Sequence, residues 1–230
     1  MTFILNIETA TQRCSVGLAR DGETIAIRES DEKNIHAAKV TVFAEEVCRE
    51  AGIGMNELAA VAVSMGPGSY TGLRIGVSAA KGFCYGLDIP LLAVSTLQSM
   101  ALGASEADGG KEVLYCPMID ARRMEVYTTL FDRQNKQLKD IEALIVDEQS
   151  FETELRDHTI KYFGDGAEKC REILDPRGMI FLDNIKPSAK YLAVIAYTKF
   201  VEGSFEDLAY FEPFYLKDFI AGKPKVKGLR

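Results

Sequence analysis

Residues 59–76 read AAVAVSMGPGSYTGLRIG, and this stretch decides the fold class. Its first seven residues are small, apolar and rich in valine, which predicts a short buried strand. The GPG run at 66–68 ends that strand, and Ser69 or Thr71 can then cap a helix that continues to about Tyr85. A buried strand that leads through a glycine turn into a helix indicates an α/β protein.

Three strands and one helix are expected upstream of this stretch. The strands are predicted at residues 3–7, 15–19 and 24–28, where the last two are joined by a hairpin turn. Apolar residues at three- and four-residue spacing predict a helix over 35–51, which Gly52 ends.

A strand at 91–94, with a helix beginning at the next residues, completes a β-β-β-α-β-α unit. The run 106–110 is the best candidate for a linker, because it is rich in glycine and acid. We therefore expect a first subdomain over 1–105, completed by a helix near 188–203. The second subdomain and the C-terminal tail would occupy 106–230.

The second part of the chain repeats the pattern of the first. An apolar strand at 113–119 ends in Asp120, as the opening strand ends in Glu8. A later strand at 160–163 leads into the glycine turn at 164–167, and a helix is predicted after it. This order of elements favours an internal duplication with two mixed sheets.

Composition excludes several classes of protein. The chain has 230 residues and a net charge of −7, which disfavours a primary role in gripping nucleic acid. No apolar run is long enough to span a bilayer, the N-terminus does not resemble a signal peptide, and the five cysteines show no close pairing. A cytoplasmic protein is expected. Bases do gather near the C-terminus, where we expect a solvated tail in preference to an RNA contact: Lys217, Lys223, Lys225, Lys227 and Arg230.

Acids and glycines at the strand ends are candidates for a nucleotide site. Glu8 and Thr9 could hold a metal or orient water near a phosphate, or Glu8 could simply be an acid that closes a strand. Asp120 is the matching acid in the second part, and Gly164 and Gly166 could cradle a phosphate or form an empty tight turn. The 66–72 run departs from both the dinucleotide fingerprint and the Walker loop.

The chain is poor in catalytic groups, and we assign it neither catalytic residues nor a metal site. His36 and His158 are its only histidines, and Val40 stands one helical turn after His36 where a zinc-binding pair would need a second histidine. No serine lies in a G-x-S-x-G context.

A stripe of small residues marks the 69–85 helix. Gly72, Gly76 and Ala80 recur every four residues, although each glycine inside a helix costs about 1 kcal/mol relative to alanine. Such a stripe lets another element approach closely. That element could be the protein's own sheet or a second subunit.

The stretch GPGSYTGLRIG at 66–76 resembles the signature of the TsaB (YeaZ) family, and the resemblance extends along nearly the whole chain. Residues 4–11 (ILNIETAT) are similar to the family's opening strand, although Glu8 stands where aspartate is usual. Residues 120–127 (DARRMEVY) and 213–217 (PFYLK) are similar to the strand and turn of its second half and to its ending.

The resemblance implies the duplicated α/β fold of the actin-like, sugar-kinase and heat-shock-chaperone ATPase superfamily. It also implies a complex in which a catalytic paralogue (TsaD), an ATPase (TsaE) and a subunit of this kind place threonylcarbamoyl on adenosine 37 of tRNA. In the catalytic paralogue two helix histidines bind metal, and the position of the second is Val40 here.

The resemblance favours a non-catalytic accessory subunit, with tRNA reached through the complex and no tightly bound cofactor, although weak nucleotide binding is compatible with it. A peptidase or chaperone-like ATPase that acts alone is the alternative. The resemblance also points to the 69–85 helix as the subunit contact, usable for TsaD or for a homodimer. The expected contact residues are Gly68, Tyr70, Thr71, Gly72, Arg74, Ile75, Gly76, Ala79, Ala80 and Phe83.

Overall fold

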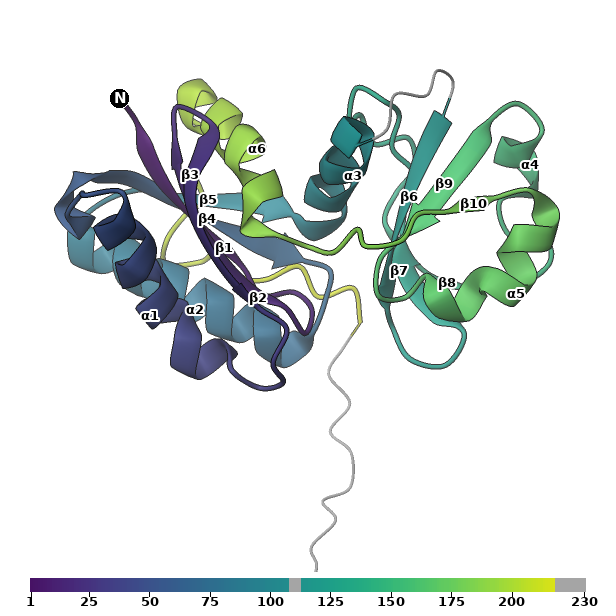
Figure 1. Cartoon of the computed structure of the whole chain (residues 1–230), viewed down its shortest axis with the longest axis horizontal. Coiled ribbons are helices and arrows are strands. Elements are labelled where there is room, and N and C mark those ends of the chain that lie inside the picture. The colour runs from purple at the N-terminus through teal and green to yellow at the C-terminus, as the bar shows by residue number, and fades with distance from the viewer. Residues whose placement is uncertain (108–112, 218–230) are drawn as a thin grey trace, which may run out of the picture.

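The computed structural model describes residues 1–107 and 113–217. The chain forms two halves that lie side by side, each built on a five-stranded mixed sheet (Figure 1). The strand order is β3-β2-β1-β4-β5 in the first sheet and β10-β9-β6-β7-β8 in the second.

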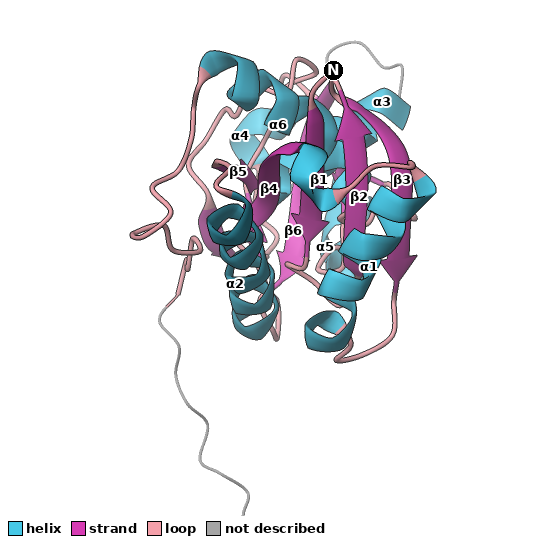
Figure 2. Cartoon of the chain, turned by 90° about the vertical axis from the view of Figure 1, so that its left-hand side faces the viewer, coloured by secondary structure: helices cyan, strands magenta, loops and turns pink. Residues whose placement is uncertain are grey.

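The first half follows the predicted order of elements closely. Its elements are β1 (Phe3–Glu8), β2 (Cys14–Arg20), β3 (Glu23–Ser30), α1 (His36–Glu50), β4 (Leu58–Gly66), α2 (Tyr70–Leu87), β5 (Leu91–Ser95) and α3 (Thr96–Ala107), with a short 3-10 turn at Met55–Glu57. Helices α1 and α2 lie next to each other over one face of the sheet (Figure 2). Their buried side chains, with those of β1, β2 and β4, form the largest apolar cluster.

The second half repeats the topology with shorter pieces. Its elements are β6 (Val113–Asp120), β7 (Glu125–Thr128), β8 (Glu142–Ile145), α4 (Glu152–Leu155), β9 (Thr159–Phe163), α5 (Arg171–Leu174), β10 (Ile180–Phe181) and α6 (Ala189–Glu202); 3-10 turns flank α5 at Glu168–Cys170 and Asp175–Arg177.

The two sheets confirm the predicted duplication. In each half the first strand pairs antiparallel with the second and parallel with the fourth, as β1 does with β2 and β4 and β6 does with β7 and β9. The last helix of each unit packs on the other half: α6 contacts β1, whereas α3 contacts β6. Leu192 and Ala196 of α6 pack with Ile4, and Met100 of α3 packs with Phe163. The halves therefore exchange helices.

The sequence prediction was wrong or incomplete in the second half. It missed β8, α4 and β10, and the helix expected after the 164–167 turn is present only as the short α5 between two 3-10 turns. The expected linker at 106–110 begins within α3, and its residues 108–110 lie outside the described residues, as do the basic residues beyond Lys217. All five cysteines are buried and unpaired, as expected for thiols that pack as apolar groups. Among the described helices, none is long and apolar enough to cross a membrane.

Candidate functional site between the two halves

Glu8 ends β1 as a fully buried carboxyl group. Its Oε1 accepts hydrogen bonds from the Ala10 backbone N–H at 2.6 Å and from the Ser64 hydroxyl at 2.9 Å, while Oε2 is buried with no partner. Burial raises the pKa of Glu8 to about 7, and the two hydrogen bonds oppose this shift. Glu8 therefore lies beneath the surface of the cleft, where a bound molecule would not touch it.

Helix α2 is seated on the turn that follows Glu8. Ser69 caps it by accepting from the Gly72 N–H, and the Ser69 N–H donates to Ala10 O at 2.7 Å. A Cβ on Gly72 would lie 2.2 Å from Thr9 O, and a Cβ on Gly76 would lie 2.2 Å from Thr9 Oγ1. Only glycine lets the helix approach the turn this closely.

This seating corrects the interpretation of the small-residue stripe as a surface for another subunit. Gly72, Gly76 and Ala80 are buried against the protein's own first sheet and the Thr9 turn. Their close approach is used inside the fold, and they cannot form an outer contact face.

The remaining residues expected at a subunit contact lie at or near the surface of α2. Thr71 and Arg74 are exposed, whereas Gly68, Tyr70, Ile75, Ala79 and Phe83 are half-buried. The outward face carries a second set of small residues that the sequence analysis did not single out. Ser78, Gly82 and Gly86 are exposed at four-residue spacing beside Tyr85, which is 83% exposed.

The second half holds an equivalent of the glycine turn. Gly166 donates its N–H to Met118 O at 3.0 Å, and a Cβ at Gly166 would lie 2.8 Å from the Ile119 carbonyl carbon. Gly164 has a φ of +110°, close to the +113° of Gly66 in the first half. Both turns use glycine to pack a loop against the end of a strand.

Asp120 differs from its counterpart Glu8 because it is exposed. It forms an ion pair with Lys169, whose Nζ also donates to Glu125 O at 2.7 Å. The neighbouring Asp165 is exposed, and its carboxylate accepts a hydrogen bond from the Asp120 N–H at 3.1 Å. The ion pair with Lys169 thus fixes the Asp120 side chain within the second half, on the side that faces the cleft.

Two adjoining cavities of about 420 and 300 Å³ occupy the cleft between the halves. Asp120, Asp165 and Lys33 are among the residues that line the larger cavity, and Gly164 lines the smaller one. Glu8, Thr9 and Gly166 are not among the lining residues. The predicted nucleotide-site residues therefore do not converge on one exposed surface.

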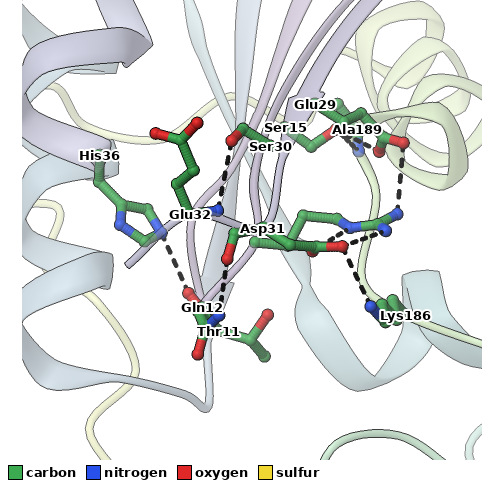
Figure 3. Close-up of polar contacts among 11 residues, drawn as sticks. Thr11, Gln12, Ser15, Glu29, Ser30, Asp31, Glu32, His36, Lys186 and Ala189 are labelled. Carbon is green, nitrogen blue, oxygen red and sulfur yellow. Dashed lines mark hydrogen bonds and ion pairs between the residues drawn. The ribbon is translucent and has the colours of Figure 1, made fainter. Parts of the chain in front are cut away.

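The rim of the cleft is a polar network shown in Figure 3. His36 Nε2 lies 3.0 Å from Thr11 O. Val40, one helical turn further along α1, is buried in the apolar core. Asp31 accepts from Arg13 at 2.9 Å and from Lys186 at 3.0 Å, and these two bases hold the pKa of Asp31 well below its usual range. His36 is explained by a backbone contact.

The duplicated halves, the exchanged helices and the cleft at the ends of β1 and β6 define the actin-like, sugar-kinase and heat-shock-chaperone ATPase class of folds. The activator of the 2-hydroxyisocaproyl-CoA dehydratase from Clostridium difficile, solved with bound ADPNP, shares this fold with a TM-score of 0.50. That likeness covers 88% of this chain and 97% of the activator at 12% identity, and it shows the fold alone.

Sequence and structure comparisons then give the family. Residues 30–217 match the family described as TsaD, tRNA N6-adenosine threonylcarbamoyltransferase. The chain is 32% identical to the tRNA threonylcarbamoyladenosine biosynthesis protein TsaB of Escherichia coli over 96% of both chains. YeaZ from Pseudomonas aeruginosa superposes with a TM-score of 0.81 at 25% identity, over 94% of this chain and all of that one. The chain belongs to the TsaB (YeaZ) family.

Proposed function

We propose that the chain is a non-catalytic subunit of the machinery that adds threonylcarbamoyl to adenosine 37 of tRNA. It would support the catalytic paralogue TsaD together with the ATPase TsaE. Relatives that match the chain over nearly their whole length are named as biosynthesis proteins of this modification. The proposal therefore concerns the role of the chain within that pathway.

The observation that carries the accessory role is the burial of Glu8. The acid that ends the first strand has no exposed surface, and glycines of α2 pack over the turn that follows it. Val40, at the position of the paralogue's second metal-binding histidine, is part of the apolar core. The duplicated fold is intact, but the acid at the end of its first strand is buried where no substrate could reach it. This arrangement suits a protein that binds partners better than one that turns over a substrate.

The outward face of α2 is the best partner surface. Thr71, Arg74, Ser78, Gly82 and Tyr85 are exposed along it. A Cβ at Gly82 would meet no atom of the described residues within 4 Å, so none of residues 1–107 and 113–217 covers that part of the helix. Neighbouring α1 adds the exposed side chain of Val42. Two helices with small and apolar groups outward can receive helices of a partner at close range.

We expect no tightly bound nucleotide, because Glu8, Thr9 and Gly166 do not line the two cavities of the cleft and Asp120 is already paired with Lys169. The net charge of −7 favours a chain that meets tRNA through its partners.

Reconstitution with labelled threonylcarbamoyl adenylate as the donor tests the proposal. The chain alone should transfer no threonylcarbamoyl and cleave no protein, whereas omitting it from a mixture with TsaD, TsaE and tRNA should remove most of the transfer. Transfer or proteolysis by the chain alone would support the alternative of a stand-alone enzyme. Full transfer without the chain would also overturn the proposal.

A further inference from the structure

The stretch from Ser204 to Lys217, here called the C-terminal strap, returns along the first half after α6 ends. Glu206 donates its N–H to Leu91 O at 2.9 Å, beside the edge strand β5. Further on, Ala209 O accepts from Lys81 of α2 at 3.3 Å. The strap is the yellow segment of Figure 1, and it ends between the two halves.

The strap next grips the beginning of α2. Phe214 donates its N–H to Met65 O at 2.7 Å, just before the glycine turn. The ring of Tyr215 lies 4.9 Å from that of Tyr70, the first residue of α2. Arg74 stands 5.4 Å over the Tyr70 ring and donates to its hydroxyl at 2.7 Å. Because Arg74 is exposed, this contact joins the strap to the outward face of α2.

Two residues later the strap reaches the second half. Lys217 forms an ion pair with Glu125 of β7, whose side chain is only 19% exposed. The backbone oxygen of Glu125 accepts from Lys169, and Lys169 pairs with Asp120 on the wall of the larger cavity. Acids and bases alternate through this cluster, so Lys217 extends an existing network.

We propose that the C-terminal strap is a clasp that holds the second half against the first and couples the outward face of α2 to the width of the cleft. The coupling to α2 rests on the proposed function, because it needs a partner seated on that face. The holding action does not. A partner that orders Arg74 and Tyr70 would fix Tyr215, and thereby place Lys217 on Glu125.

The strength of the contacts suits a reversible clasp. Exposed ion pairs of this kind shift an equilibrium about two- to fivefold, and an aromatic pair does so by about two- to tenfold. Contacts of this size can be broken and remade by a partner.

Distances between spin labels on the two halves test the clasp in the full-length chain. Labels at Arg49→Cys on α1 and Glu172→Cys on α5 report the separation, since both positions are exposed. We expect Tyr215→Ala/Lys217→Ala to raise the population of longer distances roughly tenfold. Lys136→Ala, another exposed lysine of the second half, is the matched control and should leave the distribution unchanged.

Glu125→Gln breaks the same ion pair from the other half. It should reproduce the effect of Lys217→Ala, and combining the two should add nothing further, as expected for groups that act as a pair. A distance distribution in the strap variants that superimposes on that of the original chain overturns the clasp, provided that their melting curves show folded protein.

Adding TsaD then separates the two proposals. The clasp predicts that bound TsaD shifts the label-to-label distances of the original chain toward shorter values. It predicts no such shift in the Tyr215→Ala/Lys217→Ala variant. Narrowing in both chains would contradict the coupling. Failure of TsaD to bind the original chain would contradict the proposed function instead, and would leave the result from the isolated chain standing.

Discussion

Helix α2 carries small residues at four-residue spacing on two of its faces. On the inward face, Gly72 and Gly76 have atoms of Thr9 where a Cβ would be. On the outward face, a Cβ added at Gly82 or Gly86 would meet no atom within 4 Å in the part of the chain that the structure describes. The same residue type thus serves two different purposes, and only the structure separates them.

The difference shows that a glycine that destabilises a helix can be needed for a close contact inside the fold, so it does not by itself indicate a subunit interface. The inward glycines are explained by the turn after Glu8, which leaves no room for a side chain. The outward glycines lower helix stability, by about 1 kcal/mol each, with no internal compensation. They are therefore the better indicators of a contact with another molecule.

The largest expected effect follows from filling the inward face. Gly76→Leu should destabilise the fold by about 3 kcal/mol or more, because its Cβ would meet Thr9 Oγ1 and the rest of the side chain has no space. Denaturant unfolding of the isolated chain measures this. A variant as stable as the original chain would mean that Gly76 is not packed against Thr9.

A smaller effect concerns the buried acid under the same turn. Because burial raises the pKa of Glu8 from 4.5 to about 7, the folded state binds the proton more tightly than the unfolded state. The stabilisation that comes from this tighter proton binding is fully present below pH 4.5. It is lost as the pH rises from 4.5 to 7, and stability does not change further for this reason above pH 7. The loss amounts to about 3 kcal/mol.

Glu8→Gln removes this titration and tests it. The stability difference between the variant and the original chain should shift in favour of the variant as the pH rises from 4.5 to 7. Unfolding curves across that range give the difference directly. A difference that is independent of pH would show that Glu8 does not titrate there.

The smallest effect is expected on the outward face. Gly82→Ala should stabilise the isolated chain by up to about 1 kcal/mol, since alanine favours the helix and has open space. Thermal melting measures it, with Gly76→Ala on the inward face as the matched control. A loss of stability in Gly82→Ala would mean that this face is covered by the chain itself.

Most of the first half could be predicted because its signals are local. The hairpin, the helix with buried Val40 and Val47, and the capping residue Ser69 all lie where spacing and turn chemistry place them. The second half was harder, because β10 has two residues and α4 and α5 have four each. Segments this short carry too little periodicity to be recognised from sequence.

The sequence could identify the two strand-end acids as a matching pair, but it could not give their surroundings. Sequence spacing identified Glu8 and Asp120 as equivalent strand ends, and the duplicated sheets agree. Spacing could not show that one acid is buried and the other exposed, because this depends on how α2 and α5 pack over the two glycine turns. The direction of the Gly72, Gly76 and Ala80 stripe was undecidable for the same reason.

Titration of TsaD against the Gly82→Leu variant tests the central claim most directly. The chain should remain folded, because no atom of the described residues lies within 4 Å of the new Cβ. A leucine at a close helix contact costs about 1–3 kcal/mol, so TsaD should bind roughly tenfold or more weakly than it binds the original chain. Unchanged affinity in the folded variant would contradict the assignment of the outward face of α2 to the partner.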